Sequence, residues 1–138
     1  MSAKDTFHDA VRNGLEKDGW TITSDPLRFD YGDVTFQVDL GAERLLVADR
    51  GNEKIAVEVK SFLRPSAITD FYAALGQFIS YRLALQQVEP DRLLYLAVPN
   101  DAFNSFFQTE FAKVVVDQYA VLLVVYEPIE EVIVKWIN

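Results

Sequence analysis

Residues 55–63 read IAVEVKSFL, an apolar run that carries a carboxylate and an amine two positions apart, Glu58 and Lys60. Side chains alternate between the two faces of a strand, so these two charged groups share one face, opposite the neighbouring valines. A strand apolar enough to be central has no ordinary reason to carry ionised groups, because desolvating an unpaired charge costs several kcal/mol or more. The stretch predicts a buried strand that holds either a structural salt bridge or a functional carboxylate–lysine pair.

The segments on either side predict how this strand is paired. Residues 44–49 are extended and lead into a turn at 50–53, so residues 54–62 return as the second strand of an antiparallel hairpin. Ser66 is a suitable N-cap for a long amphipathic helix that reaches about residue 87, and residues 93–98 follow as a short buried strand. A strand–helix–strand unit normally makes a right-handed crossover between parallel strands. Antiparallel and parallel pairs are therefore expected in one mixed sheet.

Periodic segments separated by Gly and Pro cover the rest of the chain. They are predicted as helices over 3–18 and 100–112, and as strands over 20–23, 34–40, 120–126 and 131–137. Gly41 interrupts the strand before it, as at a β-bulge. The fold class is α/β (α+β): one domain over residues 1–138, with the long helix on one face of the sheet and the first helix beside it or on the opposite face.

Composition restricts the chemistry that such a domain can perform. The chain has no cysteine, which excludes a disulfide framework and cysteine-ligated zinc or iron–sulfur sites. His8 is the one histidine, so a multi-histidine zinc site or a histidine-based triad is disfavoured, and a catalytic metal would be a hard ion held by oxygen. No apolar run is long enough to span a bilayer, and the start does not resemble a signal peptide. We expect a cytoplasmic protein without a membrane association.

The charge balance bears on binding to nucleic acid. The formal net charge is −8, from 21 acidic and 13 basic residues. This charge opposes the non-specific approach of a polyanion, so tight DNA binding by the isolated chain is disfavoured. Metal ions that neutralise carboxylates, or a partner subunit with a basic surface, would have to compensate.

A functional interpretation of Glu58 needs a second carboxylate within reach. Asp49 lies opposite residue 54 in the expected hairpin, about four strand positions or ~13 Å from Glu58, and is a turn residue. Asp39 lies beyond the hairpin position that faces Glu58, but a bulge at Gly41 would bring it level with that carboxylate. We favour Asp39 over Asp49. A strand-end aspartate that caps loose backbone groups explains Asp39 equally well.

Together these residues would suit phosphodiester hydrolysis. Asp39 and Glu58 supply hard oxygen ligands for Mg²⁺, with Mn²⁺ as a substitute, and the backbone carbonyl of Val59 would complete the coordination. The metal would activate water, while Lys60 would stabilise the developing oxyanion or position the nucleophile.

The arrangement resembles the PD-(D/E)XK restriction-endonuclease-like superfamily. Asp39 matches the motif aspartate, and Glu58, Val59 and Lys60 match its Glu-x-Lys on the returning strand of a hairpin, within an αβββαβ core. Val38 stands where the motif name has proline. The resemblance implies a restriction-endonuclease-like mixed sheet flanked by helices, here with extra C-terminal strands, and Mg²⁺-dependent endodeoxyribonuclease chemistry.

The long helix adds a second feature of this kind. Gln77 and Tyr81 lie four residues apart, hence on one helix face, and resemble the Gln-x-x-x-Tyr feature that flanks the active site or contacts nucleic acid in some branches of the superfamily. Arg82 beside them is a further candidate for contact with phosphate. The resemblance also makes Glu16, on the first helix, a candidate extra metal ligand. A polar pair on the solvent side of the helix remains the simpler explanation of Gln77 and Tyr81.

Nearly the whole chain is similar to the XisH-type proteins, which are named as controlling factors for excision of the fdxN element in cyanobacteria. The matching segments are FHDAV at 7–11, KDGWTIT at 17–23, DLGAE at 39–43, KIAVEVKSF at 54–62 and GQFISYR at 76–82. This resemblance implies a role in site-specific DNA rearrangement, together with a recombinase and a companion XisI-type protein.

Two hypotheses about function follow. In the first, the protein controls excision and its nuclease-like metal site hydrolyses DNA. In the second, it is a non-catalytic regulatory module that retains the fold and acts through the XisI-type partner or the recombinase. Exposed strand edges and the phenylalanine-rich segment 103–111 also predict self-association as a homodimer.

Overall fold

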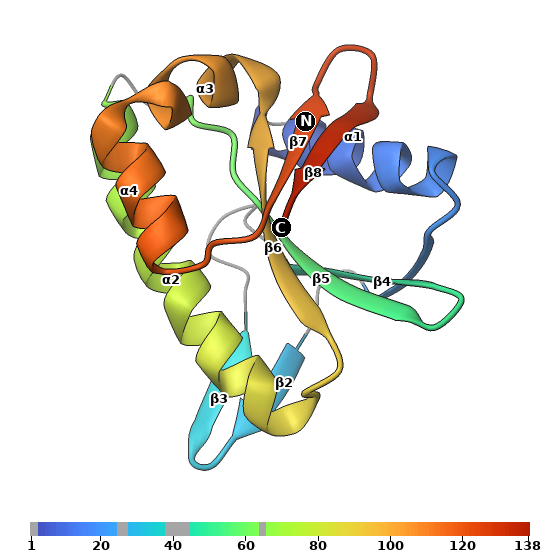
Figure 1. The fold of residues 1–138 in the computed structure, drawn as a ribbon. Coiled ribbons are helices and arrows are strands. Elements are labelled where there is room, and N and C mark those ends of the chain that lie inside the picture. Colours follow the sequence, from blue (N-terminus) through green and yellow to red (C-terminus); the bar gives the residue numbers. More distant parts are fainter. Residues whose placement is uncertain (1–2, 25–27, 38–44, 64–65) are drawn as a thin grey trace.

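A computed structural model describes residues 3–24, 28–37, 45–63 and 66–138 (Figure 1). The elements in chain order are α1 (Ala3–Lys17), β1 (Thr21–Ser24), β2 (Arg28–Tyr31), β3 (Val34–Gln37), β4 (Leu45–Arg50), β5 (Glu53–Val59), α2 (Ala67–Val88), β6 (Leu93–Pro99), α3 (Asn100–Asn104), the 3₁₀ turn η1 (Phe106–Gln108), α4 (Glu110–Gln118), β7 (Leu123–Glu127) and β8 (Val132–Ile137). Six strands form one sheet in the order β1-β4-β5-β6-β7-β8, and β2 and β3 form a separate pair.

The central strands have the predicted directions. β4 and β5 are antiparallel, with Leu45 opposite Glu58 and Asp49 opposite Lys54. β5 and β6 are parallel, with Glu58 beside Leu96, and β6 and β7 are also parallel. The mixed sheet and the α2 crossover are thus confirmed. Asp49 lies four ladder positions from the residue that faces Glu58, as the hairpin predicted.

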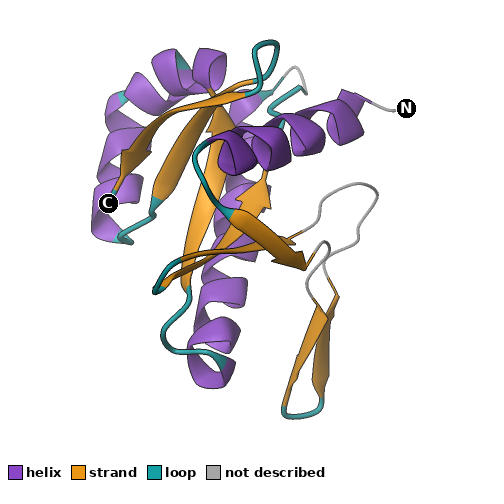
Figure 2. Cartoon of the chain, turned by 90° about the vertical axis from the view of Figure 1, so that its right-hand side faces the viewer, coloured by secondary structure: helices purple, strands orange, loops and turns teal. Residues whose placement is uncertain are grey.

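Helices cover both faces of the sheet (Figures 1 and 2). Phe71, Phe78 and Leu85 of α2 pack with Leu45 and Leu96 in the buried cluster on one face. The cluster on the other face contains residues of α1 and the alternate side chains of the strands, among them Ala10, Val11, Leu15, Val57, Val59 and Tyr126. Of the two placements predicted for the first helix, the structure therefore has the one on the opposite face.

Local signals account for the helix ends. The side chain of Ser66 accepts a hydrogen bond from the Thr69 amide at 3.3 Å, which satisfies one of the amides left open at the start of α2. After α1 the chain turns at Gly19, whose φ of 88° lies in the left-handed region that glycine adopts without strain.

Val34–Gln37 is a strand, as predicted, but its partner was not predicted. It pairs with Arg28–Tyr31 in a two-stranded hairpin outside the main sheet. Gly32, with φ of 59°, and Asp33 form its two-residue turn. A Gly-Asp pair between short β-prone runs is a known hairpin signal that the prediction overlooked. Residues 38–40 and Gly41, with the proposed bulge, lie outside the described residues.

The single helix predicted over 100–112 is also wrong. The chain forms α3, η1 and α4 in its place, and α4 continues to Gln118. The break follows from two hydroxyl side chains. Ser105 Oγ donates to the carbonyl of Asp101 at 2.7 Å, and Thr109 Oγ1 accepts from the Ala112 amide at 3.3 Å as the N-cap of a new helix. These local bonds compete with a continuous helical ladder, and the phenylalanine periodicity concealed them.

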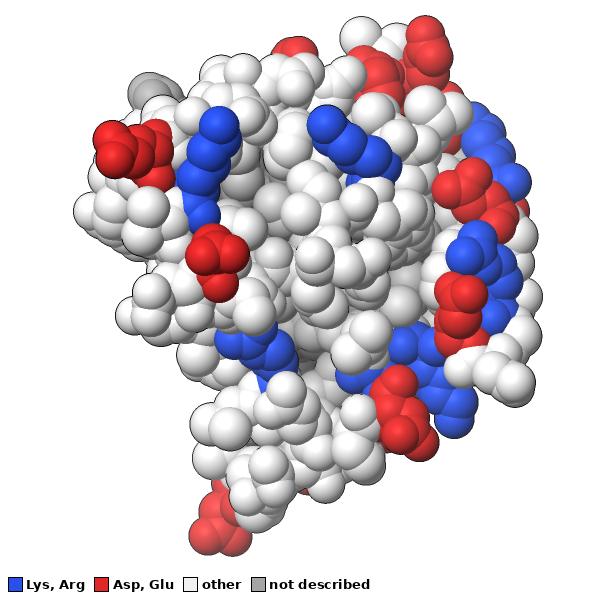
Figure 3. Space-filling model, in the orientation of Figure 1, with Lys and Arg blue, Asp and Glu red and all other residues white. Residues whose placement is uncertain are grey.

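Charged side chains are unevenly distributed over the surface in Figure 3. Side chains of both signs alternate along the right-hand edge of this view, and a smaller number of both signs also lie on its left half. None of the helices within the described ranges is long and apolar enough to cross a membrane.

Candidate functional site

Glu58 of β5 and Lys60, which directly follows β5, lie on the face of the sheet that α2 covers. Ala56 belongs to the buried cluster on this face, and Val57 and Val59 belong to the cluster on the other, so the alternation predicted for IAVEVK is confirmed. Glu58 lies between Leu45 of β4 and Leu96 of β6, and all three are at most 1% exposed. A carboxylate therefore occupies the middle of an apolar layer.

The Lys60 ammonium group connects this carboxylate to α2. Lys60 Nζ lies 3.6 Å from Glu58 Oε1 and donates a hydrogen bond of 2.5 Å to Gln77 Oε1. Lys60 is 6% exposed, and Gln77 is half-buried. The pair predicted from the sequence and one residue of the predicted helix feature thus meet in one cluster, which we call the Lys60 cluster: Glu58, Lys60 and Gln77.

The burial of this cluster has an energetic consequence. Each ion loses most of its hydration, and the mutual attraction and the hydrogen bond from Lys60 must offset that cost. Replacing such a pair by apolar residues of similar size is often neutral or stabilising, so stability alone does not explain why ions stand at these positions. The cluster also holds a carboxylate and an ammonium group in a fixed mutual orientation.

The backbone at Lys60 is anchored on the side away from α2. Its amide donates to the carbonyl of Ala97 at 3.0 Å, and its carbonyl accepts a 2.9 Å hydrogen bond from the Tyr126 hydroxyl. Tyr126 is fully buried, and burial raises the pKa of its phenol well above the ordinary range, so the hydroxyl remains a donor. Two residues later Phe62 has φ of 53°, a strained conformation for an aromatic residue, and its ring packs edge-on against Phe107 with centroids 5.4 Å apart.

The backbone carbonyl of Val59 faces away from β6. The Lys60 amide points to Ala97 of β6, and the carbonyl in the same trans peptide points the opposite way. It therefore lies on the β4 side, beyond the pair of Leu45 and Glu58 where the described part of β4 begins. Asp39, the predicted second carboxylate, lies outside the described residues. Within the described ranges, no three acidic or histidine side chains gather closely enough to hold a metal ion.

The other predicted residues have separate positions. Tyr81 follows Gln77 by one helical turn and is buried against the sheet, at 8% exposure. Arg82 donates to the carbonyls of Ala120 at 2.7 Å and Tyr119 at 2.8 Å, and so holds the C-terminal end of α4. Glu16 is exposed on α1, across the sheet, where it forms an ion pair of 3.8 Å with Arg12. The structure brings neither Arg82 nor Glu16 together with the Lys60 cluster.

Asp49, the carboxylate not favoured for the site, has a structural contact. It lies 2.7 Å from the guanidinium group of Arg92, which follows α2. Arg92 also contacts Glu89 at 3.0 Å and donates to the carbonyls of Ala48 and Ile55. We call these the Arg92 cluster: Asp49, Glu89 and Arg92 with the two carbonyls.

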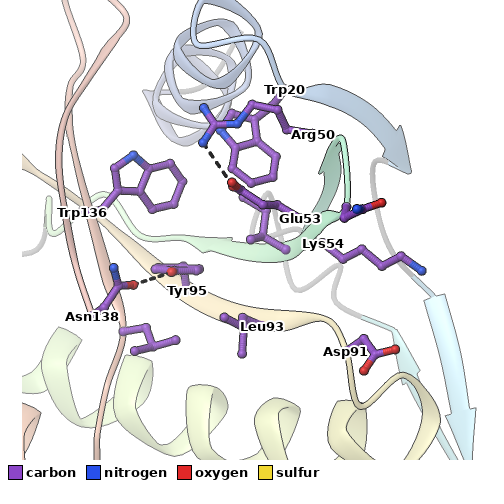
Figure 4. Close-up of a pocket in the computed structure, with 12 residues that line it drawn as sticks. Trp20, Arg50, Glu53, Lys54, Asp91, Leu93, Tyr95, Trp136 and Asn138 are labelled. Atoms are coloured by element: carbon purple, nitrogen blue, oxygen red, sulfur yellow. Dashed lines mark hydrogen bonds and ion pairs between the residues drawn. The ribbon is translucent and has the colours of Figure 1, made fainter.

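A pocket of about 760 Å³ lies on the α1 side of the sheet, away from the Lys60 cluster (Figure 4). It is lined by aromatic side chains from three parts of the chain and by the β4–β5 hairpin. Trp136 packs against Trp20 and Tyr95, with ring centroids 5.9 and 4.9 Å apart. Burial and the Glu53 carboxylate raise the pKa of Tyr95, whose hydroxyl donates to the Asn138 side chain. These residues come from distant segments, so no local sequence motif predicted the pocket.

Sequence reasoning also missed Tyr126 and Phe107. Tyr126 stood in an apolar stretch interpreted only as a strand, and its contact with Lys60 spans 66 residues. The one sequence feature that pointed to this contact was the hydroxyl of Tyr126 in a segment predicted to be buried. A buried hydroxyl requires a hydrogen-bond acceptor. Phe107 was assigned to the continuous helix, so its position against Phe62 could not be predicted.

These features define a mixed-sheet protein with helices on both faces and a buried Glu–Lys–Gln cluster at the end of a central strand. A family model described as XisH protein matches residues 1–134. The chain belongs to the XisH family.

Two solved structures agree with this assignment. A crystal structure of an XisH family protein from Nostoc punctiforme PCC 73102 is 49% identical, with a TM-score of 0.90 over 96% of this chain and 99% of that one. The crystal structure of a fdxN element excision controlling factor protein from Anabaena variabilis is 50% identical, also with a TM-score of 0.90, over 97% of this chain and 99% of that one. No curated protein matches the chain.

Proposed function

We propose that this protein is a controlling factor for excision of a DNA element, as the Anabaena variabilis relative is named, and that the Lys60 cluster acts on DNA phosphodiesters. The observation that carries the proposal is the Lys60 ammonium group, buried at the end of β5 between the Glu58 carboxylate and the Gln77 amide. The proposal includes a restriction-endonuclease-like fold. This part of the proposal is supported by the mixed sheet, in which the antiparallel β4–β5 hairpin comes before the β5–α2–β6 crossover.

The proposed site uses Mg²⁺, with Mn²⁺ as a substitute. Its ligands would be the carboxylates of Asp39 and Glu58 and the backbone carbonyl of Val59. The donor chemistry fits, because all three groups offer oxygen, which hard divalent cations prefer. The Val59 carbonyl also points away from the neighbouring strand β6, as a ligand requires. Bound metal would supply Lewis-acid stabilisation of the phosphate and an activated water.

The residues of this chain would divide the remaining work. Lys60 supplies a fixed positive charge for the oxyanion that develops at phosphorus, and a charge in a buried site acts more strongly than in water. Gln77 fixes the position of the Lys60 ammonium group from α2, and Tyr126 fixes its backbone. Tyr81, one turn further along α2, would flank the substrate. Arg82 and Glu16 are the weakest members of the proposed set, since both already have other partners.

One observation favours the second candidate function, a non-catalytic regulatory module. Glu58 is 1% exposed and Lys60 6%, so a DNA backbone could reach them only after a rearrangement. The net charge of −8 also opposes DNA binding by the chain alone. In this alternative the protein works by binding an XisI-type protein or a site-specific recombinase. In either case we propose that such a partner supplies the basic surface.

A cleavage assay separates the two functions. Purified protein, with and without an XisI-type partner, is incubated with supercoiled and branched DNA in Mg²⁺ or Mn²⁺. We expect wild type to nick the DNA and Lys60→Ala to lose at least about 100-fold in rate, the scale of removing one transition-state electrostatic group. The folded control is Glu58→Met/Lys60→Met, which removes both charges together. Equal cleavage by wild type and Lys60→Ala would sink the catalytic proposal, and no cleavage with the partner present would favour the module.

A further inference from the structure

The outer face of α2 carries a stripe of apolar side chains that are exposed or half-buried. Ile68, Tyr72, Leu75, Ile79 and Leu83 recur at spacings of three and four residues, so they lie along one side of the helix. Tyr72 is 58% exposed, Leu83 61% and Ile68 41%, while the other two are half-buried. The stripe spans 16 positions, or about 24 Å of helix. We call these five residues the α2 stripe.

The stripe is unusual because the opposite side of α2 is already the core-facing side. Phe71, Phe78 and Tyr81 are buried there against the sheet. Only Asp70 and Arg82 are charged among the 22 residues of the helix. Apolar side chains therefore occur on the outer side of α2 as well as on its core-facing side, a pattern typical of a helix that is covered on both sides.

α4 extends the apolar surface on one side of the stripe. Figure 1 places α4 beside α2, and the rings of Phe71 and Phe111 approach to 6.2 Å between centroids. Phe111 is 50% exposed and Val114 57%. The rest of the phenylalanine-rich segment packs inward, with Phe107 only 3% exposed. Self-association through this segment, which the sequence predicted, is thus limited to Phe111.

We propose that the α2 stripe, with Phe111 and Val114 at its side, is the interface of a two-fold symmetric homodimer in which two α2 helices pack antiparallel. The exposed fractions of these side chains correspond to roughly 600–700 Å² per subunit, close to the ~800 Å² that each partner contributes to a standard stable interface. A second copy supplies a matching apolar surface without any further component.

The sequence of the stripe is self-complementary in an antiparallel pair. Gly76 lies near the middle of the stripe: Tyr72 is four residues before it and the small Ser80 four after, and Ile68 and Leu83 stand at the two ends. In a two-fold pair centred on Gly76, the large Tyr72 of each copy would face the small Ser80 of the other. A Cβ at Gly76 would meet nothing within 4 Å, so the space above it is open to a second helix. Gln77 and the Lys60 cluster lie on the inner side of α2 and are not part of this contact.

Light scattering coupled to size exclusion tests the interface. At about 50 µM we expect wild type to elute at twice the chain mass of 15.7 kDa. Tyr72→Glu and Leu83→Glu should elute as monomers with unchanged helical circular dichroism, because a desolvated carboxylate is costly in an interface and harmless on an exposed helix. Ile129→Glu, at an 88% exposed position remote from α2, is the matched control and should remain dimeric. A monomeric wild type, or dimeric Tyr72→Glu and Leu83→Glu variants, would overturn the proposal.

A crosslinking experiment tests the register. Because the chain has no cysteine, Gly76→Cys introduces the single thiol of the protein. Near the proposed two-fold axis this thiol meets its own copy and should form a covalent dimer within minutes of mild oxidation. Ile129→Cys should remain largely uncrosslinked at the same concentration. Equal crosslinking of both variants, or none at Gly76→Cys, would overturn the antiparallel pairing. Both outcomes are independent of DNA cleavage, which depends on the inner face of α2.

Discussion

Two buried cations stand at opposite ends of β5, and they are held in different ways. Arg92 contacts the start of the strand and has four acceptors within 3.3 Å, namely two carboxylates and the carbonyls of Ala48 and Ile55. Lys60 follows the end of the strand, where it contacts one carboxylate at 3.6 Å and one amide oxygen at 2.5 Å. Arg92 therefore binds the backbones of two strands together, whereas the contacts of Lys60 with Glu58 and Gln77 are both to side chains.

The carboxylates that contact Arg92 are more exposed than the carboxylate that contacts Lys60. Asp49 and Glu89 are 36% and 41% exposed, so water hydrates them even when Arg92 is absent. Glu58 lies between two leucines and is 1% exposed. The Arg92 cluster has the geometry of a structural brace. The Lys60 cluster places a charge where it is costly, which is more typical of a site kept for function.

The largest expected effect follows from separating the charges of the Lys60 cluster. Lys60→Met removes the cation that lies 3.6 Å from the buried Glu58 carboxylate, and we expect the free energy of unfolding to fall by about 3–5 kcal/mol, the usual cost of breaking a buried ion pair. Urea denaturation at pH 7 measures it.

The double variant Glu58→Met/Lys60→Met is the matched control for that measurement. With both ions replaced by apolar side chains of similar length, most of the lost stability should return. If the double variant is as unstable as Lys60→Met alone, the cluster is a stabilising brace like the Arg92 cluster, and the contrast between them fails.

A smaller loss is expected at the other end of the strand. Arg92→Met removes donors from two strand carbonyls but leaves carboxylates that water can hydrate, so we expect a loss of about 2–3 kcal/mol, also by urea denaturation. Here the control is Arg92→Lys, which keeps the charge without the planar fork and should recover less than half of the loss.

The contribution of Arg92 to the free energy of unfolding should not change with pH near neutrality. Burial alone would lower the pKa of Arg92, but the hydrogen bonds to Asp49 and Glu89 outweigh it and raise the pKa above its ordinary value. A raised folded-state pKa gives stability that is complete below the unfolded pKa and is lost as the pH rises from the unfolded pKa to the folded one. Both lie far above neutral pH, so the arginine does not change its charge between about pH 6 and 9. A strong pH dependence in the arginine's own contribution would contradict this account.

The sequence was sufficient for features that depend on local periodicity. The alternation of IAVEVK fixed the face shared by Glu58 and Lys60, and Ser66 marked the start of α2. The hairpin turn predicted the pairing of Asp49 with residue 54. Prediction from the sequence failed where two local signals competed. In the helix that is broken at Ser105 and Thr109, side-chain hydrogen bonds to the backbone outweighed the apolar spacing.

Only part of the candidate site could be predicted from the sequence. The spacing placed Gln77 and Tyr81 on one face of the helix, and the contact of Gln77 with Lys60 follows from the crossover of α2 over the sheet. The contact of Tyr126 with Lys60 depends on where β7 lies in the sheet, which no periodicity specifies. Arg82 and Glu16 were predicted as site residues, but in the fold both side chains bind other partners. Arg82 donates to the Ala120 carbonyl, and Glu16 pairs with Arg12.

The smallest effect concerns Tyr126, whose hydroxyl supports the Lys60 backbone and has no counterpart in the Arg92 cluster. Tyr126→Phe removes one buried neutral hydrogen bond and should lower the free energy of unfolding by about 1 kcal/mol at pH 8. Tyr31→Phe, at a 47% exposed position, is the matched control and should change it by less than about 0.5 kcal/mol. Denaturation of the three proteins between pH 8 and pH 11 measures both the size and the pH dependence.

The sign of that pH dependence follows from burial, which raises the pKa of Tyr126 in the folded protein above the unfolded value of about 10. The tyrosine contribution is therefore complete below about pH 10 and declines by about 1.4 kcal/mol per unit above it, because only the unfolded chain releases the proton. Tyr126→Phe lacks this term, so its deficit should shrink above pH 10 and vanish near about pH 11. A deficit that stays constant up to about pH 11 would mean that the phenol ionises in the folded protein, and that the backbone support of Lys60 is accessible to water.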